Sequence, residues 1–238
     1  MPVFWLDESD LSFPPPQFAE SSGLLAISQD LRPERVVAAY QSGIFPWYEH
    51  EGFFYWYSPN PRLVLFPSEL RVHKSMRSIF NRRKFDYTFD TAFEPVMRAC
   101  AQTPRGGQVG TWICEDFIAS YTALHEQGIA HSVEVWQNGE MVGGLYGLAL
   151  GRVFFGESMF TRVPNASKAG FIVLVRALQQ SGFLLIDCQQ ETEHLKSLGA
   201  RPISRKMFLE MLRENASEPT LRGRWLLQED YRLVALPC

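Results

Sequence analysis

Cysteine is scarce in this chain of 238 residues, and its few copies are scattered. The four cysteines are Cys100, Cys114, Cys188 and Cys238, with no CxxC pair among them, so the sequence indicates neither a disulfide framework nor a zinc site. The five histidines form no HxxxH or HxH pair, which also speaks against a metal site. We therefore expect a reduced, cytoplasmic protein without a metal or cofactor.

The chain also lacks long apolar runs and a large excess of one charge. The longest uninterrupted apolar stretch lies between Lys168 and Arg176, which is far too short to cross a bilayer. The apolar segment from Met1 to Leu6 has no leading positive charge and is followed by acidic residues, so we expect no signal peptide. Since the formal net charge is −3, any contact with nucleic acid requires a local basic patch.

Hydrophobic residues are plentiful: they make up 46% of the chain, which is enough for a substantial core. The length allows one large domain or two small ones. We expect a small aromatic-rich domain at residues 1–62 and a larger domain at residues 63–238.

The segment from Arg152 to Gln189 predicts a strand, a loop, a helix and a second strand, which is one βαβ unit. Open α/β sheets bind ligands at the carboxyl ends of such strands. Here the two runs become polar at those ends, at Glu157 and at Asp187 and Gln189. Alternation along a strand would place Asp187 and Gln189 on one face and Cys188 on the other. The two polar side chains are either loop caps or functional groups.

An antiparallel meander is predicted immediately before this unit. His131 to Trp136 alternates like a half-buried strand, Asn138-Gly139 is a strong hairpin signal, and residues 141–150 return. Helices are predicted at residues 34–41, 93–102, 115–127, 191–198 and 205–215. Residues 1–30 and the tail from Arg222 are expected to be irregular or peripheral. The predicted fold class is α/β (α+β).

The densest aromatic stretch runs from Phe45 to Arg62 and contains prolines at 46, 59 and 61, which argue against regular central strands. Its aromatic residues either build a small core or stack against a nucleobase. Trp112, after the loop that contains Gly106-Gly107, is either a lid residue or a core residue.

A basic stretch runs from Arg71 to Lys84 and contains no acidic residue. Such a helix is often only a solvated face, but in an acidic chain it is the best candidate for contacts with phosphates. The predicted contacts to phosphates come from Lys74, Arg77, Arg82, Arg83 and Lys84.

Several chemistries are disfavoured. A meander followed by a strand, a helix and a strand is the element order of the N-acetyltransferase-like fold. Here the turn from Thr161 to Lys168 has no glycine that would let backbone amides bind a pyrophosphate. This argues against acyl-CoA as a substrate. Cys188 with His194 makes a poor thiol nucleophile pair if alternation turns the cysteine away. The sequence contains neither a Walker loop nor a GxSxG elbow.

A series of motifs carries a resemblance to a known family. They are Gly43-Ile44-Phe45-Pro46-Trp47-Tyr48, Trp56 to Arg62, Gly110 to Ile113, His131 to Trp136, Gly143 to Gly147, Phe155 to Phe160, Asn165 to Lys168, and Ile186 to Gln189 with Thr192, His194-Leu195 and Ser197 to Ala200. In this order they resemble the bacterial leucyl/phenylalanyl-tRNA–protein transferases. Departures are Tyr57 in place of a second tryptophan, Leu145 in place of methionine and Arg32 in place of a serine cap.

The resemblance implies a small N-terminal domain joined to an N-acetyltransferase-like (GNAT-type) domain, with the site between them. It implies an aminoacyltransferase that moves leucine or phenylalanine, with methionine as a third candidate, from tRNA to an N-terminal Arg or Lys of a protein and so marks it for N-end-rule degradation. Trp47 and Trp112 would hold the terminal adenosine. The amino-acid pocket would be formed by Leu145, Glu157, Met159 and Leu174.

The expected chemistry is aminolysis of an ester, in which the attacking amine must lose a proton. Asp187 is the candidate for orienting or deprotonating the amine, with Gln189 as its hydrogen-bonding partner. The alternative is that groups of the tRNA handle the proton. Two other functions stay open from the residues alone: a non-catalytic RNA-binding module and an acyl-CoA-dependent N-acyltransferase.

Overall fold

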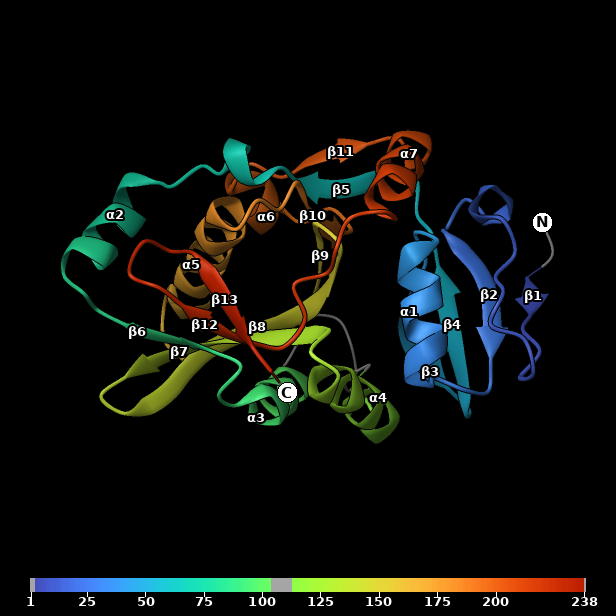
Figure 1. Cartoon of the computed structure of the whole chain (residues 1–238), viewed down its shortest axis with the longest axis horizontal. Helices are drawn as coiled ribbons and strands as arrows, with labels where there is room; N and C mark the ends of the chain where they lie inside the picture. The colour runs from blue at the N-terminus through green and yellow to red at the C-terminus, as the bar shows by residue number, and fades with distance from the viewer. Residues whose placement is uncertain (1–2, 104–112, 238) are drawn as a thin grey trace.

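The computed structural model describes residues 3–103 and 113–237. Within these residues the chain forms a larger sheet covered by helices on both faces, with a smaller sheet beside it (Figure 1). The predicted mixed α/β class is confirmed.

In the described part of the chain, the larger sheet has seven strands in the order β11-β5-β10-β9-β8-β7-β6. Their bounds, in that order, are Arg201–Ile203, Arg62–Leu65, Leu185–Gln189, Val153–Thr161, Glu140–Leu150, Ala130–Gln137 and Asp86–Phe89. Strands β9 and β10 are parallel, and every other neighbouring pair is antiparallel. The predicted meander β7-β8-β9 and the βαβ unit β9-α5-β10 are therefore confirmed, with α5 at Ala166–Gln180.

The predicted hairpin turn joins β7 to β8. Both Asn138 and Gly139 have positive φ, at 54° and 80°, which is the conformation that a tight two-residue hairpin requires. Further along β8, a Cβ at Gly143 would lie 2.8 Å from that of Ala166. The glycine therefore lets the first turn of α5 pack close to the sheet.

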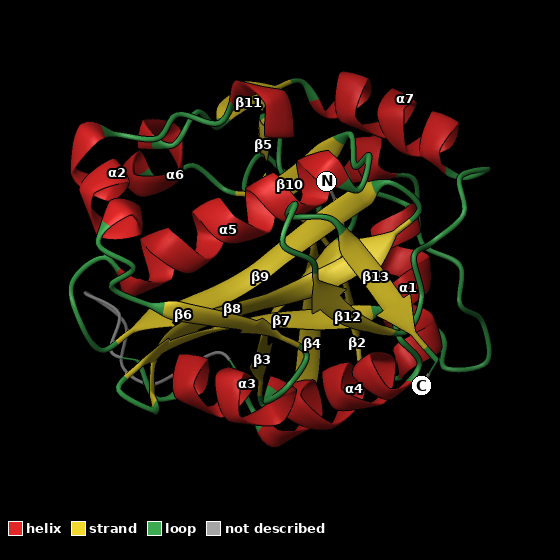
Figure 2. Ribbon diagram, turned by 60° about the vertical axis from the view of Figure 1, so that its left-hand side comes forward, coloured by secondary structure: helices red, strands yellow, loops and turns green. Residues whose placement is uncertain are grey.

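Helices cover both faces of the larger sheet, with α5 on one face and α3 and α4 on the other (Figure 2). The remaining α-helices are α1 (Pro33–Gln41), α2 (Lys74–Asn81), α3 (Phe93–Ala101), α4 (Glu115–Glu126), α6 (Glu193–Ser197) and α7 (Arg205–Asn215), and two 3₁₀ turns lie at Pro16–Phe18 and Pro67–Glu69. Each predicted helix is present. Ser204 caps α7 by accepting a hydrogen bond from the Met207 amide, whereas Arg32 at the start of α1 forms no side-chain cap.

The smaller sheet has the order β1-β2-β4-β3 in the described residues, with bounds Phe4–Trp5, Leu24–Ser28, Phe53–Tyr57 and Phe45–His50. Helix α1 lies on its side nearest the larger sheet (Figure 1). This corrects two expectations: residues 1–30 contain two strands, and the aromatic stretch contains the central strand β4. Pro46 is tolerated because β3 is an edge strand, paired on one side only, and its register against β4 is irregular between Pro46 and Tyr48.

The C-terminal tail is also more than peripheral. It forms the hairpin β12 (Arg224–Leu227) and β13 (Leu233–Leu236), and Trp225 is fully buried. The Trp225 ring stacks on His131 with centroids 3.6 Å apart, and its amide donates to Asp90 at 2.6 Å. The expectation failed because Trp225 finds its partners about 90 and 130 residues earlier in the chain.

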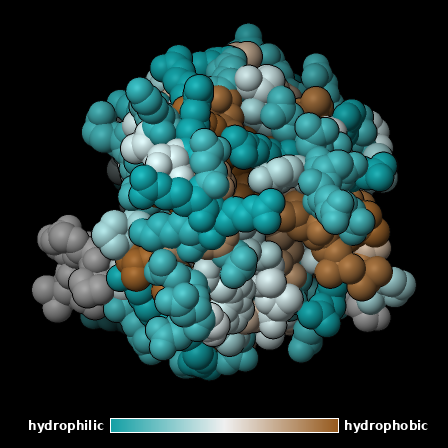
Figure 3. All heavy atoms as spheres, turned by 90° about the vertical axis from the view of Figure 1, so that its left-hand side faces the viewer, coloured by the Kyte–Doolittle hydropathy of each residue, from teal (hydrophilic) through white to brown (hydrophobic). Residues whose placement is uncertain are grey.

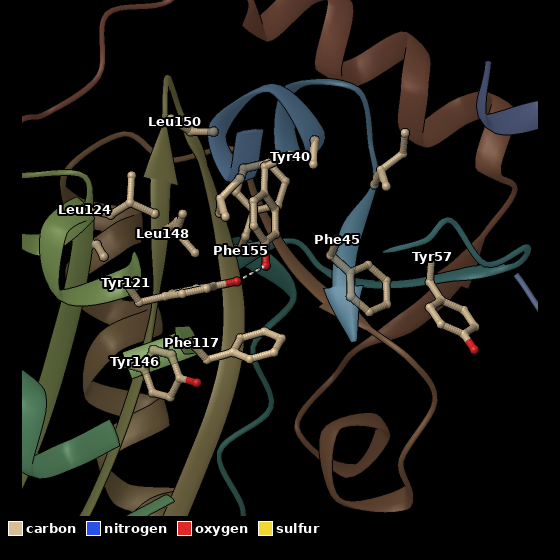
Figure 4. Packing of buried hydrophobic residues seen from close by; sticks show 14 of the residues in the cluster. Tyr40, Phe45, Tyr57, Phe117, Tyr121, Leu124, Tyr146, Leu148, Leu150 and Phe155 are labelled. Carbon is tan, nitrogen blue, oxygen red and sulfur yellow. Dashed lines mark hydrogen bonds between the residues drawn. The ribbon is translucent and has the colours of Figure 1, made fainter. Parts of the chain in front are cut away.

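Alternation along β9 divides the core into two clusters. Phe154 packs on the face under α5, while Phe155 packs on the other face, where its ring lies 5.0 Å from that of Tyr40. This second cluster joins α1, α4 and the two sheets (Figure 4). The expected domain boundary after residue 62 falls directly after the first residue of β5, and division into two domains stays a prediction.

Candidate functional site

A cavity of about 590 Å³ opens where β10 ends and the pairing between β9 and β10 stops. It is lined by parts of β3, β8, β9, α5, β10 and the segment up to α6: Phe45, Pro46, Trp47, Thr103, Leu145, Tyr146, Phe154, Gly156, Glu157, Ser158, Met159, Phe171, Leu174, Ile186, Asp187, Cys188, Gln189, Gln190, Thr192, His194 and Leu195. The cavity thus lies at the carboxyl end of the parallel pairing, beside the Glu157, Asp187 and Gln189 side chains that the sequence predicts there, although β9 itself continues to Thr161.

The two parallel strands pair only as far as Asp187 opposite Phe155. Beyond this point β10 is irregular, because its register against β5 shifts between Asp187 and Gln189, and Gln189 has a positive φ of 61°. Asp187, Cys188 and Gln189 all line the cavity, but Cys188 packs against the core cluster under α5. The side chains of Asp187 and Gln189 instead bond to Arg62 and Glu157, beside the other cluster. The cysteine is still a poor nucleophile, since burial and the Asp187 charge raise the pKa of its thiol well above its ordinary value.

The Asp187 carboxylate forms a bidentate ion pair with Arg62 of β5. Arg62 Nε donates to Oδ1 at 2.8 Å and Nη2 donates to Oδ2 at 2.6 Å, and both side chains are buried. The Arg62 guanidinium lies between the rings of Phe45 and Phe208, 4.7 Å from each centroid. One arginine therefore connects β3 of the smaller sheet, β10 of the larger sheet and helix α7.

Glu157 is at the centre of a second polar cluster. Its carboxylate accepts hydrogen bonds from the hydroxyls of Tyr40 and Tyr121, the latter at 3.2 Å, and from Gln189 Nε2 at 3.0 Å. The two tyrosine hydroxyls are 2.9 Å apart (Figure 4). Burial raises the pKa of Glu157 to about 8, with a smaller contribution from Asp187, while the two tyrosine hydrogen bonds oppose the shift.

The predicted pair of Asp187 and Gln189 is connected through the backbone. The Gln189 amide donates to Asp187 Oδ1 at 2.9 Å, whereas the Gln189 side chain reaches Glu157. Asp187 therefore fixes the backbone of Gln189, and Gln189 in turn places its carboxamide against the Glu157 carboxylate in the cavity.

An apolar lining occupies another part of the cavity. Leu145, Met159 and Leu174, which the sequence analysis assigned to an amino-acid pocket, are all there, together with Phe154 and Phe171. Trp47 also lines the cavity, and its ring packs edge-on against Tyr57 at 4.7 Å. Trp112 lies outside the described residues.

Sequence reasoning missed Tyr40 and Tyr121, which stand at ordinary buried positions of α1 and α4 with no pattern to mark them. The sequence analysis considered His194 as a partner of Cys188 and as part of a motif. It lines the cavity, and its Nε2 atom has no hydrogen-bond partner in the described part of the chain. Burial and the nearby Lys168 lower the pKa of His194, so its imidazole is neutral at pH 7.

The predicted basic helix is α2. Lys74 and Arg77 of this helix and Arg82 directly after it line a surface hollow of about 550 Å³ outside the cavity. Within residues 3–103 and 113–237, none of the five predicted tRNA contacts forms an ion pair, and all five side chains are exposed. The face on this side of the molecule is mostly hydrophilic (Figure 3). These cations are therefore free to meet an external anion.

The structure describes no helix that is both long and apolar enough to span a membrane. The cavity combines an apolar lining with a polar end whose carboxylate can exchange a proton near neutral pH. Together with the β9-α5-β10 unit, this is a ligand-binding cavity of an α/β fold, suited to an apolar group held beside an ionisable carboxylate. The particular family follows from comparison with known proteins.

The family model described as leucyl/phenylalanyl-tRNA protein transferase matches residues 64–213, and the model of its N-terminal domain matches residues 29–60. The leucyl/phenylalanyl-tRNA–protein transferase of Myxococcus xanthus is 50% identical over 226 residues, which cover 94% of this chain and 97% of that protein. That of Stutzerimonas stutzeri is 53% identical over 218 residues, 91% of this chain and 96% of that protein. The chain belongs to the leucyl/phenylalanyl-tRNA protein transferase family and is an aminoacyltransferase that uses aminoacyl-tRNA and a protein acceptor.

Solved structures add little to this assignment. The structure of L-PGS from Bacillus licheniformis matches with a TM-score of 0.38 at 12% identity and covers 85% of this chain and 67% of that one. A GCN5-related N-acetyltransferase from Kribbella flavida matches with a TM-score of 0.37 at 13% identity and covers 75% and 64%. At these TM-scores the likeness supports no conclusion, and the fold class depends on the strand order of the sheet itself.

Proposed function

We propose that this enzyme transfers leucine or phenylalanine from Leu-tRNA or Phe-tRNA to the N-terminal Arg or Lys of acceptor proteins and so marks them for degradation. The observation that carries the proposal is the cavity at the ends of β9 and β10, in which Leu145, Met159 and Leu174 adjoin the polar cluster of Glu157. An apolar aminoacyl side chain is buried favourably against such a lining, whereas a charged one would be desolvated at a cost. A cytoplasmic location is part of the proposal.

The donor's terminal adenosine is assigned to the end of the cavity lined by Trp47, where a base can stack on an aromatic ring. Trp112 is assigned to the same adenosine from the sequence alone. Helix α2 supplies Lys74 and Arg77, with Arg82, Arg83 and Lys84 directly after it, as contacts to the phosphates of the acceptor stem.

We assign the acceptor's α-amine to the polar end of the cavity. Gln189 and Glu157 lie there, and Asp187 fixes the backbone of Gln189. Holding the amine beside the ester carbonyl supplies much of the rate enhancement, because the ester is already activated.

Incubation with radiolabelled Phe-tRNA and a peptide that begins with Arg tests the proposal. We expect label to appear in the peptide, and no label in the same peptide with an acetylated N-terminus, because its amine can no longer attack. An equal yield with peptides that begin with Ala and with Arg would contradict the proposed acceptor. Absence of transfer with every donor and acceptor would contradict the function.

A further inference from the structure

We propose that Glu157 takes the proton from the attacking α-amine, and that Asp187 is a positioning residue that acts through Gln189. This assignment deepens the proposed aminoacyl transfer and depends on it. It departs from the expectation that Asp187 itself is the base.

The hydrogen bonds of Asp187 argue against a role as base. Oδ1 accepts from Arg62 Nε and from the Gln189 amide, Oδ2 accepts from Arg62 Nη2, and the side chain has no exposed surface. A proton on this carboxylate would break a charge-assisted hydrogen bond and leave the buried Arg62 guanidinium without its counter-ion. Asp187 is therefore held as an anion that faces Arg62.

Glu157 differs from Asp187 in the charge of its hydrogen-bond donors. Its three hydrogen-bond donors, Tyr40, Tyr121 and Gln189, are all neutral, and Glu157 itself lines the cavity. Glu157 can therefore gain or lose a proton without leaving a buried cation unpaired. Burial also raises its pKa to about 8, close to that of an α-amine, and a general base works best when its pKa is near the operating pH.

The charged and titratable groups around Glu157 come from four elements. Tyr40 on α1 and Tyr121 on α4 have their pKa raised by burial, so they stay neutral donors. Asp187 on β10 raises the pKa of Glu157, and Arg62 on β5 lowers it, both less than burial raises it. Of the other titratable cavity residues, Cys188 has a raised pKa and His194 a lowered one, so both are neutral near pH 8.

The proposed step balances as follows. The amine nitrogen bonds to the ester carbonyl carbon, and the proton that this nitrogen loses moves to the Glu157 carboxylate. The C–O bond to the 3′ oxygen of the terminal ribose then breaks, and the proton on Glu157 moves to that oxygen. A new peptide bond and a free 3′ hydroxyl result, and Glu157 returns to its ionised form.

The test is the pH dependence of single-turnover transfer at saturating Phe-tRNA and subsaturating Arg-peptide. Below about pH 7 both the amine and Glu157 must lose a proton, so we expect the logarithm of the wild-type rate to rise with a slope near 2. In Glu157→Gln we expect a slope near 1 and a rate about 10²–10⁴-fold lower. In the matched variant Asp187→Asn the slope should stay near 2 even if the rate falls.

A slope near 2 in Glu157→Gln would overturn the proposal, as would a slope near 1 in Asp187→Asn alone. Tyr121→Phe provides an independent check. Loss of this hydrogen-bond donor should raise the pKa of Glu157 and shift the pH–rate profile to higher pH, whereas loss of a merely structural tyrosine would not. Wild-type transfer reports on the proposed function and the change in slope reports on Glu157, so the two can fail separately.

Discussion

Arg62 and Asp187 meet in a buried bidentate ion pair although 125 positions separate them in the chain. The pair joins neighbouring strands of the larger sheet, and the Arg62 guanidinium lies between aromatic rings of β3 and α7. A single side chain thus holds the backbone of Asp187 at the cavity and fixes the smaller sheet against it. The first prediction follows from this arrangement.

Removing one partner of the pair should destabilise the protein strongly. Arg62→Met leaves Asp187 buried without its counter-ion, and we expect a loss of about 3–5 kcal/mol in the free energy of unfolding, measured by urea denaturation. The control is Arg201→Met, which breaks the exposed bidentate pair with Glu69 and should cost no more than about 1 kcal/mol. Similar losses in both variants would contradict the structural role of Arg62.

Glu157 should make stability depend on pH. Its pKa is about 8 in the folded protein and 4.5 when unfolded, so between these values the folded state binds the extra proton. The stabilising effect of that proton is complete below pH 4.5 and is lost as the pH rises to about 8. We expect the urea midpoint of the wild type to fall between pH 5.5 and pH 8 by more than that of Glu157→Gln, and parallel curves would contradict the raised pKa.

Charge reversal at Arg82 and Arg83 tests the tRNA contact. The double variant to Glu should raise the apparent KM for Phe-tRNA and flatten its salt dependence, because fewer phosphates are neutralised. Activity with a minimal aminoacyl-adenosine donor should be nearly unchanged. Lys206→Glu with Arg213→Glu, at exposed positions of α7, makes the same change in net charge. Equal effects of the two double variants would show a response to net charge alone.

The volume of the apolar pocket should determine which donor is used. Leu145→Phe places a larger side chain in the cavity, and we expect it to reduce kcat/KM for Phe-tRNA about 10–200-fold more than for Leu-tRNA. Because both donors are assayed on the same variant, a folding defect would lower both rates equally. An unchanged ratio of kcat/KM would show that Leu145 does not contact the donor side chain.

The C-terminal hairpin should contribute to the stability of the larger sheet. Trp225→Ala removes a fully buried ring that stacks on His131, and we expect a loss of about 3–5 kcal/mol by chemical denaturation. Leu226→Ala on the same strand is the control, because its side chain is exposed and should contribute much less. A small effect of Trp225→Ala would contradict this contribution to stability and would indicate that the tail is peripheral.

The sequence by itself determined the features that depend on neighbouring residues. Pro33 begins α1, Asn138-Gly139 turns the hairpin, and Ser204 caps α7, because turn and cap preferences act over a few positions. Periodicity likewise identified the meander and the βαβ unit. The general rule for such units then predicted the position of the cavity.

Only the tertiary structure decided which side chains meet there. Tyr40 lies 117 positions from Glu157, and no local pattern distinguishes such a tyrosine from an ordinary core residue. The register shift between Asp187 and Gln189 likewise depends on pairing with β5, which no local pattern in the sequence shows. Distant parts of the chain supply both the neutral donors around Glu157 and the arginine that forms an ion pair with Asp187. These partners decide which of the two carboxylates can exchange a proton.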